Sequence, residues 1–369
     1  MVSGNFFNLF DQYYSLAPSV DLLITEMRNT RYRQPAWYRY VAGFAGDKPV
    51  VVVENPYGGV IPELVDKLKV GRGYDLFRMS VYEAAALGAN MSVPYGSWMG
   101  SVIEDSFYAP HDLCVEIQHF LAEHDHLFSP RTLSETAVVY SVESNFQLVA
   151  RRDLFAGNRA NVSGSDVIPF WEVCDTLANS AQPFDVLFFP DGQLRRDTLQ
   201  ASDLRQYRTL ILPDCRFLTP EQARLLSAYL EQGGRLLVLG RLGDNLPLNE
   251  QQSLLTHPNT HQAKGDFNLS QLPLGVQSHC DPMTDLALNV QQVDGGAVVH
   301  IIRYDFNEES DCVPLLPELT LALRLPQHFE RSEGYSPGSR PEVSLSFADG
   351  WHHLNLRNIP LYTMVSLKS

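Results

Sequence analysis

The chain has 369 residues, of which 44% are hydrophobic and 19% charged, and its formal net charge is −15. This length can bury a sizeable core and suggests two or three domains. The acidic balance argues against nucleic acid or an anionic membrane surface as the main partner, because phosphate binding needs clustered Lys and Arg. A neutral ligand such as a sugar fits this balance better.

The sequence gives no sign of secretion, of a membrane span or of a bound cofactor. Its five cysteines are widely spaced and include no Cys-x-x-Cys pair, so neither a zinc knuckle nor a disulfide framework is indicated. The amino terminus lacks a basic segment followed by an apolar one, and no stretch reaches about 18 uninterrupted apolar residues. We therefore expect a reduced, cytoplasmic protein that uses no metal and no cofactor.

Strands and helices alternate over a first region, 1–132. Apolar runs predict strands over 20–26, 50–54 and 88–96, with helices over 37–45 and 76–87 between them. Such units build parallel sheets with right-handed crossovers. About three strands are too few to close an eight-stranded barrel, so this region is either part of a barrel or an open sheet.

Two further regions follow. Over 133–262, short apolar runs alternate with helical stretches, and Thr219 and Pro220 mark the start of a helix over 220–232. This alternation predicts a doubly wound, flavodoxin-like sheet. Over 263–369, hairpin signals dominate, such as the Gly-rich turn at 293–296 between two apolar runs, and predict a small β-sandwich.

Glu54 has the setting most suggestive of chemistry. It ends the segment Lys-Pro-Val-Val-Val-Val-Glu (48–54), whose four valines predict a strand buried on both faces. Active-site residues of parallel barrels lie at the carboxyl ends of the strands. Glu26 ends the preceding predicted strand, so the two acids could line one cleft. The plainer alternative is that each is the last, solvated residue of its strand.

Other reactive side chains have ordinary structural explanations. His119, His124 and His126 have no second cluster of ligands near them in sequence, which favours a solvated helix end over a metal site. Cys215 lies between a strand and a helix, as a nucleophile would. The surrounding Pro-Asp-Cys-Arg-Phe (213–217) lacks the glycines of a strained elbow turn, so we predict a structural cysteine.

Three segments within 48–99 resemble the last two strand-helix units of the catalytic barrel in glycoside hydrolase family 42, the β-galactosidase family. They are Lys-Pro-Val-Val-Val-Val-Glu (48–54), Phe-Arg-Met-Ser-Val-Tyr-Glu-Ala-Ala-Ala-Leu-Gly-Ala (77–89) and Asn-Met-Ser-Val-Pro-Tyr-Gly-Ser-Trp (90–98). Members of the family follow the barrel with a glutamine-amidotransferase-like domain used in trimerisation, and then a small β-sandwich. The predicted order of domains in this chain is the same.

By this resemblance, Glu54 corresponds to the nucleophile of a retaining glycosidase that forms a glycosyl-enzyme intermediate. Tyr57, Tyr95 and Trp98 would shape the sugar site by ring stacking, although aromatic residues there could equally pack over the barrel mouth. Glu26 would be a weaker candidate for hydrogen bonds to the substrate. The resemblance further implies a carbohydrate substrate and a homotrimer formed through the middle domain.

The chain also departs from the family pattern. Retaining hydrolysis needs two carboxyl groups about 5–5.5 Å apart, one as nucleophile and one as general acid/base. In the family the acid/base Glu follows an Asn at the end of an earlier strand, which would lie before Met1. The aromatic-arginine tail of the family's last strand is replaced by Tyr-Gly-Ser-Trp (95–98). We therefore expect a truncated and inactive glycosidase; the alternative is a non-catalytic carbohydrate-binding or oligomerisation protein derived from one.

Overall fold

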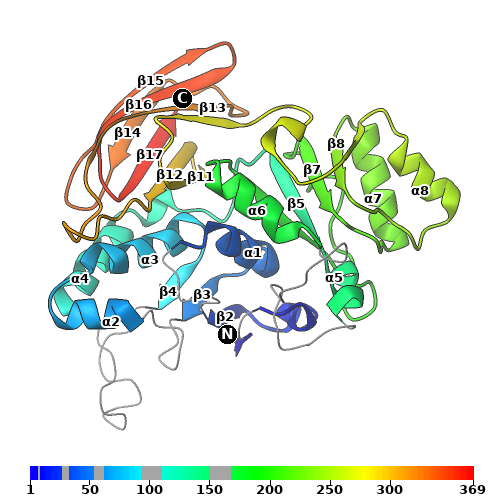
Figure 1. Ribbon diagram of the computed structural model, residues 1–369, viewed down its shortest axis with the longest axis horizontal. Coiled ribbons are helices and arrows are strands. Elements are labelled where there is room, and N and C mark those ends of the chain that lie inside the picture. Colours follow the sequence, from blue (N-terminus) through cyan, green and yellow to red (C-terminus); the bar gives the residue numbers. More distant parts are fainter. Residues whose placement is uncertain (7–8, 27–32, 54–61, 93–109, 150–167) are drawn as a thin grey trace, which may run out of the picture.

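The computed structural model of the chain combines two parallel sheets with a pair of antiparallel sheets (Figure 1). No helix in the described part of the chain is long and apolar enough to cross a membrane. The residues that the structure describes are 1–6, 9–26, 33–53, 62–92, 110–149 and 168–369.

The amino-terminal sheet has four parallel strands in the order in which they occur in the sequence. These are β1 (Ser3–Asn5), β2 (Leu22–Glu26), β3 (Val50–Val53) and β4 (Asn90–Ser92). Strand β1 was not predicted, because three residues are too few for an alternating pattern to be recognisable. The connecting and following helices are η1 (Asp11–Tyr13), η2 (Ala17–Ser19), α1 (Pro35–Ala45), α2 (Pro62–Lys69), α3 (Tyr74–Ala86), α4 (His111–Glu123) and η3 (Asp125–Leu127).

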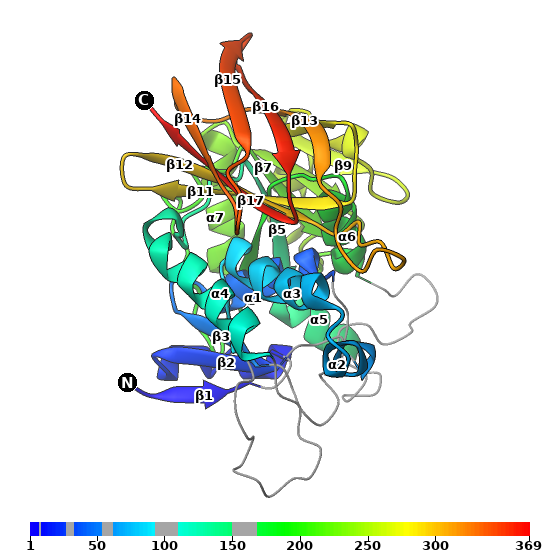
Figure 2. The same ribbon diagram turned by 90° about the vertical axis from the view of Figure 1, so that its left-hand side faces the viewer.

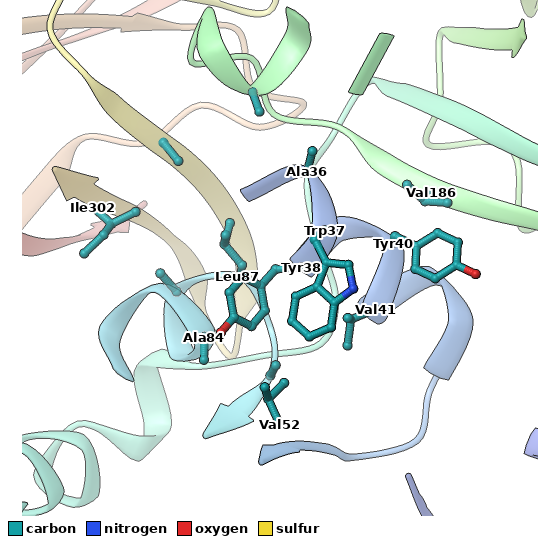
Figure 3. Packing of buried hydrophobic residues seen from close by; sticks show 14 of the residues in the cluster. Ala36, Trp37, Tyr38, Tyr40, Val41, Val52, Ala84, Leu87, Val186 and Ile302 are labelled. Carbon is teal, nitrogen blue, oxygen red and sulfur yellow. The ribbon is translucent and has the colours of Figure 1, made fainter. Parts of the chain in front are cut away.

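The two faces of this sheet differ in burial, contrary to the prediction that the valine strand is buried on both. Val50 and Val52 are 1% and 0% exposed, whereas Val51 and Val53 are only half-buried. Figure 3 shows Val52 among side chains of α1, including Trp37. The helices therefore cover one face of the sheet, and the side chains of the other face keep part of their surface in contact with solvent.

The middle sheet has five parallel strands in the order β6-β5-β7-β8-β9. This is the order 2-1-3-4-5 of doubly wound sheets of the flavodoxin type. Its helix α7 begins as predicted, with Thr219 as N-cap in a capping box with Gln222. The elements are β5 (Thr136–Ser141), α5 (Val142–Val149), α6 (Phe170–Asn179), β6 (Asp185–Phe189), β7 (Thr209–Pro213), α7 (Pro220–Glu231), β8 (Arg235–Leu239), α8 (Leu248–Leu255) and β9 (Thr260–Ala263).

The carboxyl-terminal part consists of two antiparallel sheets with four strands each, in the orders β10-β13-β16-β15 and β11-β12-β17-β14. Aliphatic side chains of both sheets form their shared core, as in a sandwich. The elements are η4 (Leu269–Gln271), β10 (Ser278–Asp281), β11 (Leu286–Val293), β12 (Gly296–Arg303), β13 (Leu316–Leu323), β14 (Arg331–Tyr335), β15 (Glu342–Ala348), β16 (Trp351–Ile359) and β17 (Tyr362–Lys368).

Helices α1 and α3 join the amino-terminal sheet to the rest of the molecule. Helix α1 packs against β3 and β6, and α3 packs against β4 and β12. Gly43 brings α1 close to β6, since a Cβ atom at this position would lie 2.3 Å from the carbonyl oxygen of Val186. One hydrophobic cluster thus runs through all three sheet systems, and the amino-terminal sheet is held on its helical side.

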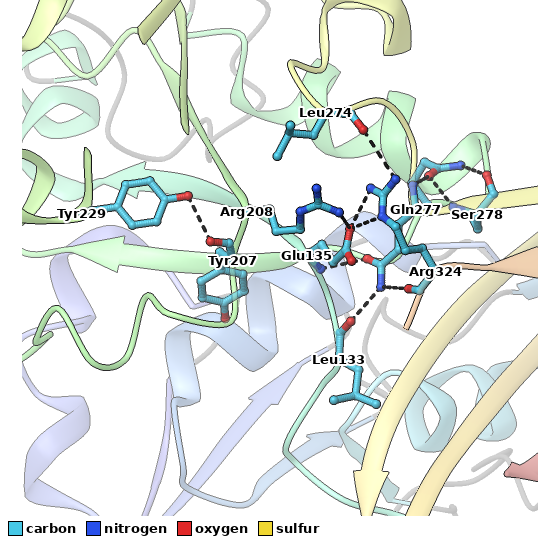
Figure 4. A network of polar contacts seen from close by, with 10 residues as sticks. Leu133, Glu135, Tyr207, Arg208, Tyr229, Leu274, Gln277, Ser278 and Arg324 are labelled. Carbon is cyan, nitrogen blue, oxygen red and sulfur yellow. Dashed lines mark hydrogen bonds and ion pairs between the residues drawn. The ribbon is translucent and has the colours of Figure 1, made fainter. Parts of the chain in front are cut away.

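A polar network joins the middle sheet to the sandwich (Figure 4). The Glu135 carboxylate forms ion pairs with Arg324 at 2.7 Å and with Arg208 at 3.5 Å. The Gln277 side chain accepts a hydrogen bond from the Glu135 N–H and donates one to the Leu133 carbonyl, at 2.8 Å and 2.7 Å. These contacts fix the segment that enters β5 against the sandwich.

Candidate functional site

The carboxyl ends of β2, β3 and β4 lie side by side at one edge of the amino-terminal sheet. In the register of the strands, Glu26 is paired with Val53, and Val53 is paired with Ser92. Parallel sheets bind ligands at this edge. Glu54 is the next residue after Val53 in the sequence, but Glu54 itself lies outside the described residues.

Three further residues predicted for this site, Tyr57, Tyr95 and Trp98, also lie outside the described part of the chain. Glu26 is the member of the predicted set whose surroundings the structure gives. Its carboxylate oxygen Oε1 accepts a hydrogen bond from Asn5 Nδ2 at 3.4 Å, and its side chain is half-buried. Because the carboxylate keeps part of its contact with solvent at the end of the strand, its charged form loses little hydration free energy in the fold.

Asn5 is a further candidate for this site that the sequence did not predict. It is the last residue of β1, is exposed, and pairs in register with Ile24 of β2. Its amide group offers two donors and one acceptor beside the Glu26 carboxylate. Strand β1 has no alternating apolar pattern, so the sequence does not predict it. Asn5 lies beside Glu26 because β1 pairs with β2.

The strand ends of the middle sheet are occupied by their own side chains. Ser141 donates a hydrogen bond to Ser144 at 2.7 Å, and Asp214 forms an ion pair with Arg216 at 2.6 Å. Cys215 is fully buried, and this burial raises the pKa of its thiol well above the ordinary value. A thiol held in its neutral form is a poor nucleophile, which agrees with the prediction of a structural cysteine.

The histidines near the end of α4 make local contacts. His124 Nδ1 lies 2.9 Å from the carbonyl oxygen of Phe120, and His119 and His126 are exposed. Among the residues that the structure describes, no group of three or more His, Cys, Asp and Glu side chains is arranged to hold a metal ion. The strand ends of the amino-terminal sheet therefore remain the candidate site.

Comparison with known proteins places the fold among glycosidase structures. No protein-family model and no curated protein sequence matches this chain. The fold is similar to that of α-L-fucosidase isoenzyme 2 from Paenibacillus thiaminolyticus, with a TM-score of 0.61 and 12% identity over 96% of this chain and 66% of that chain. It is also similar to β-galactosidase from Bacillus circulans sp. alkalophilus, with a TM-score of 0.50 and 13% identity over 100% of this chain and 63% of that chain.

These similarities define a class of fold. The chain has a mixed α/β fold with parallel and antiparallel sheets, and this fold is similar to those of the two glycosidases. It spans slightly less than two thirds of the length of each of the two solved chains. At 12% and 13% identity the likeness concerns the fold, and activity has to be argued from the site.

Proposed function

We propose that this chain is the carboxyl-terminal part of a retaining glycoside hydrolase of the β-galactosidase type. The observation that carries the proposal is the register of β2, β3 and β4, in which Glu26 and Val53 end neighbouring parallel strands and the sequence continues from Val53 into Glu54. The fold shared with two glycosidases supports this proposal.

In the proposed reaction, the Glu54 carboxylate attacks the anomeric carbon of the sugar. A bond forms between the carboxylate oxygen and the anomeric carbon, the glycosidic bond breaks, and the leaving oxygen takes a proton from a general acid. Water then releases the sugar with help from the same group acting as a base. We propose that this second carboxyl group lies on the part of the barrel that this chain does not contain.

The remaining site residues would bind the sugar. Asn5 and Glu26 together offer donors and acceptors at adjacent strand ends, which suits the hydroxyl groups of a neutral sugar. Tyr57, Tyr95 and Trp98 are proposed to stack on its apolar face. The net charge of −15 agrees with an uncharged substrate.

We propose three domains, 1–132, 133–262 and 263–369. Strand β9 of the middle sheet pairs with β8 and ends at Ala263, at the second of these boundaries. We propose that the middle unit is amidotransferase-like and assembles the protein as a trimer. Five free cysteines, three of them buried, agree with the cytoplasmic location that we propose.

Sugar binding tests the proposal. In saturation-transfer NMR with galactose and with fucose, we expect binding by the chain and clear weakening in Asn5→Ala and Glu26→Gln. The matched control is Glu123→Gln, which changes an exposed carboxylate on α4. Absence of binding to both sugars, or binding that neither site variant changes, would contradict the proposal.

Turnover tests whether this chain by itself holds a complete catalytic pair. With the general acid/base proposed to lie outside this chain, we expect no measurable turnover of nitrophenyl glycosides by the chain alone. Clear turnover that Glu54→Gln abolishes would show that the chain holds a complete catalytic pair. Sugar binding without covalent labelling of Glu54 by an activated fluoroglycoside would favour the alternative, a non-catalytic carbohydrate-binding protein.

A further inference from the structure

The connection between β1 and β2 is unusual for a parallel sheet. In the described segment 9–20 it forms only the short 3₁₀-helices η1 and η2, whereas strands of a parallel barrel are normally joined by an α-helix. Leu9, Asp11 and Tyr14 of this segment are nevertheless 0%, 7% and 6% exposed. A segment without an α-helix of its own cannot bury these side chains alone, so neighbouring elements have to cover them.

Two side chains of the amino-terminal region hold the ends of this segment. The Tyr40 hydroxyl on α1 donates a hydrogen bond to the Leu9 carbonyl at 2.8 Å. The Lys48 ammonium donates to the carbonyls of Ala17 and Val20 at 2.7 Å and 2.6 Å. The central part of the segment, which contains η1, is held from a different part of the chain.

The middle unit (133–262) holds this central part. The Tyr140 hydroxyl donates a hydrogen bond to Asp11 Oδ1 at 2.6 Å. Arg195 Nη1 donates to the Tyr14 carbonyl at 3.0 Å, and the guanidinium carbon lies 3.7 Å from the centre of the Tyr14 ring. The same ring stacks on Phe188, with 4.6 Å between the ring centres. Hydrogen bonds, a cation–π contact and ring stacking thus join the segment to the middle unit.

These contacts come from the carboxyl ends of two neighbouring strands. Tyr140 and Phe188 are the next-to-last residues of β5 and β6, which pair in parallel. Doubly wound sheets bind their ligands beyond this edge, and here the edge binds a segment of the amino-terminal region. Figure 1 and Figure 2 show β1 and β2 at the end of the molecule opposite the sandwich. The middle unit is therefore the neighbour that can hold the segment between them.

Strand β1 is short, and the contact at its end is long. It has three residues, each paired with one residue of β2, and so short a strand adds little stability by itself. Asn5 Nδ2 lies 3.4 Å from the Glu26 carboxylate oxygen, close to the longest distance at which a hydrogen bond forms. A small shift of β1 would therefore break this contact at the candidate site.

We propose that the middle unit positions the candidate site. Tyr140 and Arg195 hold the segment 9–20, and this segment keeps Asn5 beside Glu26. Tyr140 and Arg195 are positioning residues, because they act through the segment. That Asn5 and Glu26 bind a sugar rests on the proposed function, whereas the support of β1 by the middle unit does not.

Hydrogen exchange tests the support of β1. The Phe6 N–H donates to the Ile24 carbonyl at 2.7 Å, so its exchange rate reports the pairing of this end of β1 with β2. In Tyr140→Phe and in Arg195→Gln, the amides of 9–20 and the Phe6 amide should exchange roughly tenfold faster, because one anchor of the segment is lost. Mass spectrometry of amino-terminal peptides measures these rates.

Each variant has a matched control in the middle unit. Tyr229→Phe also removes a buried tyrosine hydroxyl, whose hydrogen bond at 3.1 Å goes to the Tyr207 carbonyl. Arg196→Gln removes the same charge from the exposed neighbour of Arg195. Both controls should exchange like the wild type at the amino-terminal amides. Wild-type exchange in Tyr140→Phe and Arg195→Gln, or equally fast exchange in the controls, would overturn the proposal.

Sugar affinity tests the consequence for the site. In titrations with galactose and fucose, we expect Arg195→Gln to weaken binding about fivefold, the effect of losing about one hydrogen bond, and Arg196→Gln to leave it unchanged. Unchanged affinity in an Arg195→Gln chain whose β1 exchanges faster would overturn the positioning role. A wild-type chain that binds neither sugar would instead contradict the proposed function, and the exchange rates would still decide whether the middle unit holds β1.

Discussion

The Tyr304 hydroxyl donates a hydrogen bond to the Glu83 carboxyl at 2.7 Å, across the junction between α3 and the sandwich. The Gln34 N–H donates to the same oxygen, also at 2.7 Å. Glu83 is 1% exposed, and its burial raises the pKa of its carboxyl from 4.5 to about 8, although the two hydrogen bonds lower it in part. The carboxyl is therefore mainly protonated at neutral pH.

This protonation links the stability of the fold to pH. The unfolded chain loses the Glu83 proton near pH 4.5, whereas the folded chain keeps it up to about pH 8. The stabilisation is therefore fully present below the unfolded pKa and is lost as the pH rises through the folded pKa. Glu83→Gln imitates the neutral form, so it should raise the free energy of unfolding at pH 8 by on the order of 4 kcal/mol relative to the wild type.

Urea unfolding at pH 5 and pH 8 measures this effect. The gain from Glu83→Gln should be larger at pH 8 than at pH 5, because the wild type has lost only a small part of this stabilisation at pH 5 and most of it at pH 8. Glu123→Gln on the exposed side of α4 should change neither value. An equal effect of Glu83→Gln at both pH values would mean that Glu83 ionises in the fold as it does in the unfolded chain.

Asn289 is expected to hold α1 and α3 against β11. Its side chain accepts a hydrogen bond from Arg39 at 2.9 Å and donates one to the Ala86 carbonyl at 2.6 Å, and both Arg39 and Asn289 are buried. Asn289→Ala leaves the buried guanidinium and the carbonyl with fewer partners, which should cost about 2–4 kcal/mol of unfolding free energy. Asn355→Ala on the exposed face of β16 is the matched control and should cost less than about 0.5 kcal/mol. Similar losses in the two variants would show that the buried network contributes little.

Gly43 tests how closely α1 packs on the middle sheet. Ala is the better helix former by about 1 kcal/mol, so helix propensity alone predicts that Gly43→Ala stabilises the protein. The new Cβ would lie 2.3 Å from the Val186 carbonyl oxygen, and we expect this overlap to prevail, with a net loss of about 1–3 kcal/mol. Ala42→Ser, at the half-buried neighbouring position, should change stability by less than about 0.5 kcal/mol. A rise in melting temperature for Gly43→Ala would contradict the close packing.

The sequence predicted those elements whose signals are local. Short apolar runs predicted strands in the middle region, where β5 and β7 are found, and Thr219 before Pro220 predicted the start of α7. Helix α6 was missed, although Phe170, Val173 and Leu177 stand at helical spacing and are buried. This spacing is the sequence signal of an amphipathic helix.

The features that the sequence could not predict depend on strand pairing. The contact between Asn5 and Glu26 exists because β1 pairs with β2, and a three-residue strand carries no pattern that fixes its register. The half-burial of Val51 depends on what packs against this face of the sheet. A strand that is covered on both faces and a strand that is covered on one face can have the same apolar sequence, so the sequence does not predict this burial.

Covalent trapping at Glu54 tests the central claim most directly. A 2-deoxy-2-fluorogalactosyl fluoride carries a leaving group that needs no general acid, and its fluorine slows release of the sugar from the enzyme. When the Glu54 carboxylate displaces fluoride, an ester to the anomeric carbon forms. The account predicts a single sugar adduct, mapped by peptide mass spectrometry to Glu54, that is absent from Glu54→Gln. An unmodified protein, or an adduct on a different residue, would contradict it.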